Sequence, residues 1–251
     1  MAGGISISII RGSAFRAKAD SDTVGTGMYK VTNNKIQEVI MKQRIFNLII
    51  LDESGSMSSI EREAITGVNE TVQTIRAAQK KHGAQEHFVT LVSFNSDSVK
   101  TIYENVEVDK VEELTGKQYQ PACCTPLYDA MGNALTKLSK NVADRDVILV
   151  TVITDGYENA SQEYDGKAIK SLVESLKSKG WVFTYIGTNQ DVEKVAATIS
   201  ITNTLEFNAS SEGTHAMFAK ESRSRSRFFD RLARKIAKDK LMEDYFNDDD
   251  D

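Results

Sequence analysis

Two long apolar runs limit the folds that this chain can adopt. Residues 45–51 read Ile-Phe-Asn-Leu-Ile-Ile-Leu, and residues 147–153 read Val-Ile-Leu-Val-Thr-Val-Ile. Runs rich in β-branched residues are typical of strands buried on both faces, because a strand with one solvated face alternates apolar and polar residues. We therefore expect these two segments to be central strands of a parallel sheet that is covered by helices.

Polar residues follow each run, at the point where each strand is expected to end. Asp52, Ser54 and Ser56 follow the first run, and Asp155 follows the second. Thr125 stands before Pro126, at the start of a predicted helix. In open α/β sheets, ligands bind at the carboxyl ends of the strands, where the strand order reverses. These positions therefore predict a binding site at one end of the sheet.

The order and spacing of these residues resemble the metal-ion-dependent adhesion site of von Willebrand factor type A domains. The resemblance covers residues 43–210. It implies a Rossmann-like α/β fold with a mostly parallel central sheet and helices on both faces. It also implies a metal held by three hydroxyls and by two carboxylates that bind directly or through water, namely Asp52, Ser54, Ser56, Thr125 and Asp155.

The chemistry of this ligand set selects the metal. All five side chains offer oxygen, which favours Mg²⁺, with Mn²⁺ or Ca²⁺ as alternatives, over Zn²⁺. Two carboxylates at most cancel the double charge of the ion, and the hydroxyls add no charge. Such a metal can accept a further anionic ligand, and the resemblance implies that a Glu or Asp of a partner protein fills this place.

Each of these residues also has a purely structural alternative. Thr125 is a suitable helix N-cap, Ser54 and Ser56 are suitable turn residues, and Asp155-Gly156 reads as a turn. Two acidic residues near the site in sequence, Asp129 and Glu158, either orient the ligands or are simply solvated. Glu53 and Met57 are expected on the rim of the site.

The region between and after the two runs alternates predicted helices and strands, which is the pattern of a sheet layered between helices. Ser58 and Glu61 resemble a capping box at the start of the first helix. Further strands are expected at residues 87–94, at 101–108 on an edge, at 181–187 and at 204–207. Further helices are expected around residues 127–138, 169–176 and 192–199.

Residues 1–42 are expected to form a small β appendage. Ile5, Ile7 and Ile9 alternate with serines, and a hairpin is predicted around 28–40. It is interpreted as an extra hairpin on the sheet edge, with a strand donated to a partner or a disordered leader as alternatives.

The other end of the chain is charged. Residues 211–242 are expected to form a basic amphipathic helix with an apolar stripe through Phe228 and Phe229 and with Arg223, Arg225 and Arg227 among its polar positions. A solvated face is the favoured interpretation, with phosphate or acidic surfaces as alternative ligands. The acidic tail, residues 243–251, is expected to be disordered.

Composition narrows the class of protein. A net charge of −5 argues against nucleic-acid binding, and no stretch reaches the length of a membrane span. Cys123 and Cys124 are adjacent, which argues against a disulfide framework and favours a reducing cytoplasm. We also expect no secretory signal, so the resemblance implies an intracellular, microbial or viral relative. The three histidines show no metal-binding spacing and are expected on the surface or at helix ends.

The sequence thus favours a non-enzymatic adaptor that docks an acidic residue of its partner on Mg²⁺. Similar intracellular proteins serve multiprotein complexes, including partners of ring (AAA+) ATPases. One alternative is a structural subunit of a larger phage, secretion, defence or ring-ATPase-associated complex in which the metal is incidental. Another is a metal-dependent phosphoester hydrolase, which is disfavoured because no His, Lys or Glu motif near the site suggests a nucleophile or base.

Overall fold

The computed structural model describes residues 42–188, 191–234 and 245–246, together with four strands before residue 42. The chain divides into two compact units, Met1–Lys42 and Gln43–Asp251. Of the acidic tail predicted to be disordered, residues 243–251, only Tyr245 and Phe246 are described, and both are buried, so the prediction is wrong for these two. The rest of the tail lies outside the described residues. Within the described ranges, no helix combines the length and apolar content needed to span a bilayer.

The first unit contains a four-stranded antiparallel sheet in the order β1-β2-β3-β4. Its strands are β1 (Ser6–Ile9), β2 (Ala14–Lys18), β3 (Met28–Thr32) and β4 (Lys35–Val39). The predicted hairpin is present as β3 and β4, with Thr32 opposite Lys35. The strand β2 was not predicted.

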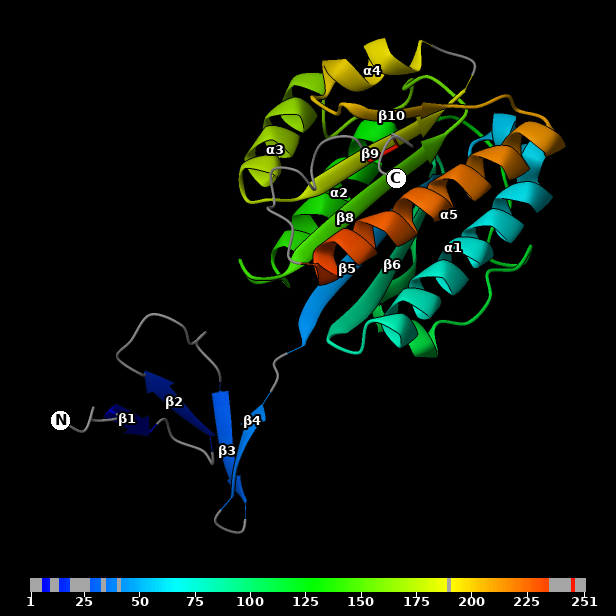
Figure 1. Ribbon diagram of the computed structural model, residues 1–251. Helices are drawn as coiled ribbons and strands as arrows, with labels where there is room; N and C mark the ends of the chain where they lie inside the picture. The colour runs from blue at the N-terminus through cyan, green and yellow to red at the C-terminus, as the bar shows by residue number, and fades with distance from the viewer. Residues whose placement is uncertain are drawn as a thin grey trace. The chain divides into compact units, whose positions relative to one another are not determined.

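The second unit is built on a six-stranded sheet in the order β10-β9-β8-β5-β6-β7 (Figure 1). All neighbouring pairs are parallel except β6 and β7, which are antiparallel. The strands are β5 (Gln43–Asp52), β6 (Gln85–Asn95), β7 (Ser98–Glu107), β8 (Val147–Thr154), β9 (Val182–Gly187) and β10 (Asn203–Glu206). The two apolar runs are therefore adjacent central strands, as predicted, and residues 98–107 form an edge strand.

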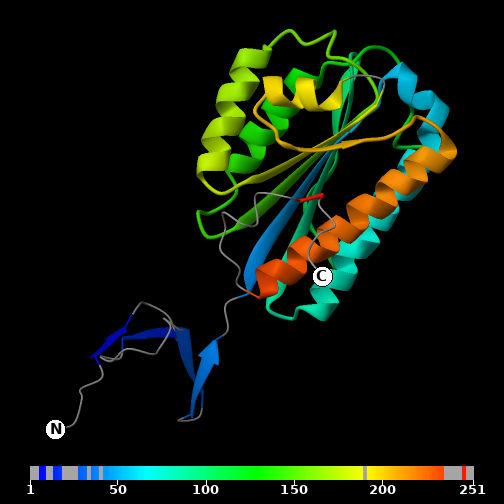
Figure 2. The same cartoon turned by 45° about the horizontal axis from the view of Figure 1, so that its top comes forward.

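Helices cover both faces of this sheet, as Figures 1 and 2 show. One apolar core joins the sheet to α1 (Glu61–Lys81) and α5 (Ser211–Ala233). The other core joins the opposite face to α2 (Leu127–Ser139), α3 (Gly166–Ser178) and α4 (Val192–Thr198). Short 3₁₀ helices occur at η1 (Gly55–Ile60) and η2 (Val108–Lys110). The sequence-based expectation of a Rossmann-like α/β fold is confirmed.

The predicted capping box at Ser58 is wrong. Residues 55–60 form η1, and α1 begins at Glu61 with Ile60 at its N-cap and no side-chain cap. The residues that were expected to form the first turn of the helix belong instead to the 3₁₀ helix η1.

Helices α1 and α5 pack closely because Gly67 has no side chain. A Cβ at residue 67 would lie 2.0 Å from Cδ2 of Phe218, which is buried. We therefore expect Gly67→Ala to destabilise the fold by about 1–3 kcal/mol, since the clash outweighs the roughly 1 kcal/mol gain in helix propensity. Urea denaturation measures this loss. Gly83→Ala is the control, because nothing lies within 4 Å of a Cβ there, and an equal loss in both variants would contradict the packing explanation.

The expectation that the basic residues of the C-terminal helix lie on a solvated face is wrong for Arg225. Arg225 is 0% exposed and pairs with Glu221, which is also buried. Its guanidinium donates to Oδ1 of Asn47 on β5 (3.0 Å) and to Oγ1 of Thr151 on β8 (2.8 Å). Tyr245, beyond the helix, donates to Glu221 (3.2 Å). This buried polar network fixes α5 against the two central strands.

His87 is also buried, although the histidines were expected at the surface or at helix ends. Its ring is 0% exposed and packs edge-on against Phe229, with ring centroids 4.5 Å apart. Burial, together with the charges of Arg225 and His82, lowers the pKa of His87 to about 3. The native state therefore holds this imidazole in its neutral form.

This burial predicts a loss of stability in acid. Below the ordinary pKa of 6.5, the imidazole of residue 87 takes up a proton only in the unfolded chain. The contribution of His87 to the free energy of unfolding is therefore complete above pH 6.5 and declines toward pH 3. Between pH 6.5 and about pH 5, the wild type should lose about 2 kcal/mol more than His87→Gln in urea denaturation. His215→Gln, at an exposed residue, should keep the wild-type pH dependence. Parallel pH curves for wild type and His87→Gln would contradict this assignment.

Candidate metal-binding site

The candidate site lies where the strand order reverses. β5 is the first strand of the sheet in the chain, with β6 on one side and β8 on the other. Leu51 of β5 is paired with Ile153 of β8 in parallel register, so the residues that follow them leave the sheet side by side. This arrangement brings Asp52 and Asp155 to the same end of the sheet, as the sequence predicted from the general rule for open sheets.

Asp52 is fully buried and fixed by two hydrogen bonds. Its Oδ1 accepts from the backbone N–H of Ser54 (2.7 Å), and its Oδ2 accepts from Oγ1 of Thr154 (2.6 Å). Burial raises the pKa of Asp52 to about 6, and the groups that oppose this rise are the Thr154 and Ser54 hydrogen bonds rather than a basic side chain. Thr154 was not predicted as part of the site because it continues the apolar run of β8.

The serines connect the two aspartates. Ser54 Oγ lies 3.2 Å from Ser56 Oγ, and Ser56 Oγ donates to Oδ1 of Asp155 at 2.6 Å. Ser56 is exposed, whereas Ser54 and Asp155 are buried. Burial also raises the pKa of Asp155. Four of the five predicted residues are thus linked by hydrogen bonds, Asp52 through the backbone N–H of Ser54 and the other three through side-chain oxygens.

Thr125 reaches the same place from the third segment. A Cβ at Gly156 would lie 3.3 Å from Oγ1 of Thr125 and 3.7 Å from Oγ of Ser56. Gly156 therefore leaves free the space beside these two hydroxyls. Thr125 does not cap α2, since Pro126 occupies the N-cap position and no side chain caps the helix. The structure brings all five predicted side chains together.

The loop that carries Asp155 is held by side chains that accept hydrogen bonds from its backbone. Asp129 accepts from the N–H groups of residues 162–164, and Glu158 accepts from those of Tyr128, Ala160 and Ser161. Asn159, which was not predicted, accepts from the N–H of Thr125 (2.9 Å). Asp129 and Glu158 therefore position the loop rather than lie on a solvated face.

Glu53 and Met57 do not line the rim as expected, because both are 0% exposed. Oε1 of Glu53 accepts from Nζ of Lys100 (2.7 Å) and from the N–H of Gln120 (2.7 Å). Its backbone oxygen accepts from Ala122 (2.9 Å). Glu53 therefore anchors the loop that leads to Thr125.

The donors fit a hard divalent cation. They comprise two carboxylates and three hydroxyls, and among the described residues no basic side chain lowers the pKa of the buried Asp52. The described part of the chain contains no cluster of three or more His, Cys, Asp or Glu side chains that could hold a metal. The neighbouring thiols of Cys123 and Cys124 are free and exposed.

Comparison with known proteins agrees with this architecture. The family model for the von Willebrand factor type A domain matches residues 48–228. No curated protein matches the chain in sequence.

Solved structures with a similar fold include pilus proteins of bacteria. The D319A mutant of the PilB minor pilin from Streptococcus sanguinis is 13% identical, with a TM-score of 0.56 over 89% of this chain and 76% of that one. The pilus adhesin SpaC from Lactobacillus rhamnosus GG is 12% identical, with a TM-score of 0.53 over 90% of this chain but only 34% of SpaC. The vWF domain of the type V pili tip protein Mfa5 from Porphyromonas gingivalis is 10% identical, with a TM-score of 0.52 over 74% and 96%. At these identities the likeness concerns the fold alone.

Proposed function

Because the chain belongs to the von Willebrand factor type A domain family, we propose that it is a protein-interaction module that docks an acidic residue of its partner on a bound Mg²⁺ ion. Mn²⁺ or Ca²⁺ would serve the same oxygen donors. The residues that would hold the ion are Asp52, Ser54, Ser56, Thr125 and Asp155.

One observation carries this proposal. Three segments that are far apart in sequence bring five oxygen side chains to one end of the sheet. Ser54 joins Asp52 through its backbone N–H (2.7 Å), Ser54 Oγ lies 3.2 Å from Ser56 Oγ, and Ser56 Oγ donates to Asp155 (2.6 Å). The hydroxyl of Thr125 lies beside Gly156, where a Cβ would come within 3.3 Å of it. A turn residue or helix cap would need none of these contacts.

The balance of charge explains why such a site would bind an anion. Asp52 and Asp155 together bring two negative charges, and the three hydroxyls bring none. When bound, the cation supplies an electrophilic position at which a carboxylate can complete the coordination. Thr154 holds the Asp52 carboxylate in place through its 2.6 Å hydrogen bond, so the donor is oriented before any ligand arrives.

The proposal includes the cellular location of the module and the kind of complex that supplies its partner. Similar folds occur in a minor pilin and a pilus adhesin, which supports a role in binding other proteins. The two free thiols of Cys123 and Cys124 support the cytoplasm of a microbial or viral system as its location, where a multiprotein complex such as one with a ring ATPase would supply the partner.

A pull-down from the native host in Mg²⁺ and again in EDTA tests this function. We expect a partner that is retained only with Mg²⁺ and is lost with Thr125→Ala. Thr202→Ala, at an exposed residue beside β10, is the matched control and should retain the partner. A partner that is bound equally in EDTA and by Thr125→Ala would contradict metal-dependent docking and favour a structural subunit.

A further inference from the structure

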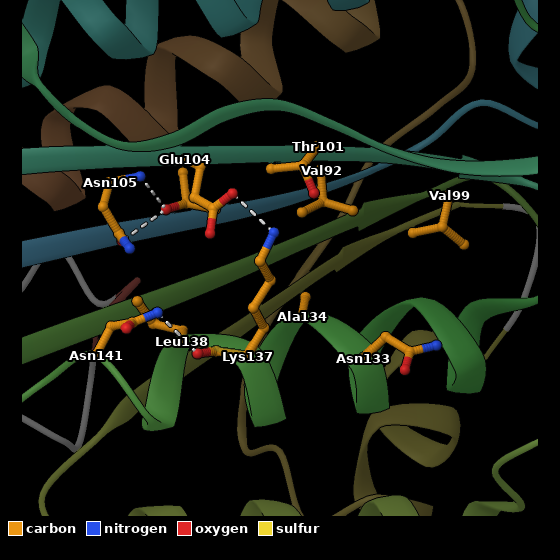
Figure 3. Close-up of a pocket in the computed structure, with 11 residues that line it drawn as sticks. Val92, Val99, Thr101, Glu104, Asn105, Asn133, Ala134, Lys137, Leu138 and Asn141 are labelled. Carbon is orange, nitrogen blue, oxygen red and sulfur yellow. Dashed lines mark hydrogen bonds and ion pairs between the residues drawn. The ribbon is translucent and has the colours of Figure 1, made fainter.

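A groove between the edge strand β7 and helix α2 is separate from the candidate metal site. It has a volume of about 290 Å³ and is lined by residues of β6, β7 and α2 (Figure 3). Its apolar lining includes Val92, Ala134 and Leu138. Val99, also in the lining, is 43% exposed and is one of two large hydrophobic residues that are exposed within the described part of the chain.

The groove exists because β7 departs from regular pairing with β6. The register shifts between Val89 and Leu91 and again between Leu91 and Val92. Asn105 adopts a left-handed backbone with φ of 50°, held by reciprocal 3.0 Å hydrogen bonds with Thr90. Irregular pairing of this kind bends a strand and redirects its side chains.

The polar lining suits a peptide main chain. Three carboxamides line the groove, and each already makes one hydrogen bond within the chain: Asn105 Oδ1 accepts from Thr90, and the amide nitrogens of Asn133 and Asn141 donate to Glu163 and to the backbone oxygen of Lys137. The amide nitrogen of Asn105 and the amide oxygens of Asn133 and Asn141 therefore remain to bond a main chain, as one donor and two acceptors. The two charged residues of the lining, Glu104 and Lys137, pair with each other across the groove at 2.7 Å (Figure 3). The occupant therefore meets carboxamides and apolar side chains without a net charge.

The groove leads away from the candidate metal site. Val99 is paired with Phe94, and Phe94 is paired with Asp52, so this end of β7 lies at the metal-site end of the sheet. Near the other end, Val106 is paired with Val89, which is paired with Asn47 in the middle of β5. From Val99 to Asn105 the strand spans roughly 20 Å, the length of about six extended residues.

We propose that this groove binds an extended, uncharged segment of the partner protein, with an apolar side chain against Val99 and Val92 and with its main chain hydrogen-bonded to the three asparagines. The segment adjoins the acidic residue that docks on the metal, so the inference rests on the proposed function.

The test uses the full chain and a display library of random peptides that share one fixed glutamate. The library is selected in Mg²⁺, and enriched peptides are measured against variants. We expect enriched sequences to carry an apolar residue within about six positions of the glutamate. Val99→Asp should weaken their binding by at least about tenfold, since it places a charge on an apolar contact. Thr202→Asp, which adds the same charge beside β10 at the opposite edge of the sheet, should bind them normally.

The outcomes separate this inference from the proposed function. Equal binding by Val99→Asp and wild type would overturn the groove assignment and leave metal-dependent docking intact. No enrichment in Mg²⁺ over EDTA would overturn both. Binding of simple N-alkylamides in the groove without any enriched peptide would make it a small-molecule site and would overturn the peptide assignment.

Discussion

Asp52→Asn is expected to abolish the stabilisation of this protein by Mg²⁺. With Mg²⁺ at about 100 times its dissociation constant, the wild type should gain about 2.7 kcal/mol, because the ion binds the folded chain only. For a domain of this size, that gain raises the melting temperature by roughly 5–10 °C. The variant should show no such rise in a thermal scan.

The substitution removes charge with little change in shape. The amide oxygen can still accept from the N–H of Ser54, and the Thr154 hydroxyl can donate instead to the backbone oxygen of Gly156, which is 3.2 Å away. Burial raises the pKa of Asp52 to about 6, so the wild type carries a poorly solvated charge above that pH. In EDTA at neutral pH, the variant should therefore be at least as stable as the wild type.

Asp165→Asn is the matched control for this experiment. Asp165 caps α3 by accepting from the N–H of Ala168, and asparagine serves this role as well. It should keep the full response to Mg²⁺. An unchanged Mg²⁺ response in Asp52→Asn would remove Asp52 from the ligand set.

Arg225→Met is expected to destabilise the fold by about 3–5 kcal/mol in urea denaturation. The cost arises from Glu221, which would remain buried with a charge and no cationic partner. The substitution also removes the guanidinium donor to Oδ1 of Asn47, whereas Thr151 still accepts from the hydroxyl of Thr184.

A second variant identifies this cause. Adding Glu221→Gln to Arg225→Met removes the stranded charge while keeping an acceptor for Tyr245, so the double variant should recover about 2 kcal/mol or more. Arg223→Met, at an exposed position of the same helix, should change stability by less than about 0.5 kcal/mol. A loss below about 1 kcal/mol in Arg225→Met would contradict the buried network.

The central sheet and the placement of the five side chains follow from local sequence signals. A run such as residues 45–51 can bury both faces only in the middle of a sheet, and the residue after it must then lie at the carboxyl end. Asp52 and Asp155 could therefore be placed at one end before any contact was known. The edge position predicted for the more polar strand at residues 101–108 follows from the same reasoning.

The roles of other residues depend on contacts between positions that are distant in sequence, and the sequence indicates these roles only weakly. Thr154 looks like one more β-branched residue of a strand, although its hydroxyl holds Asp52. The burial of Arg225 could have been suspected from Asn47 and Thr151, the two polar residues inside the apolar runs, because buried polar side chains need partners. The sequence around Arg225, with its alternating Arg and Ser, instead resembles a solvated face.

Soaking crystals of the full chain in Mn²⁺ and recording anomalous scattering tests the central claim most directly. The five-oxygen site predicts one anomalous peak per chain, within bonding distance of the Ser54, Ser56 and Thr125 hydroxyls and beside Asp52 and Asp155, and no such peak in Asp52→Asn. A wild-type map without a peak at this end of the sheet, or with the peak unchanged in Asp52→Asn, would contradict it.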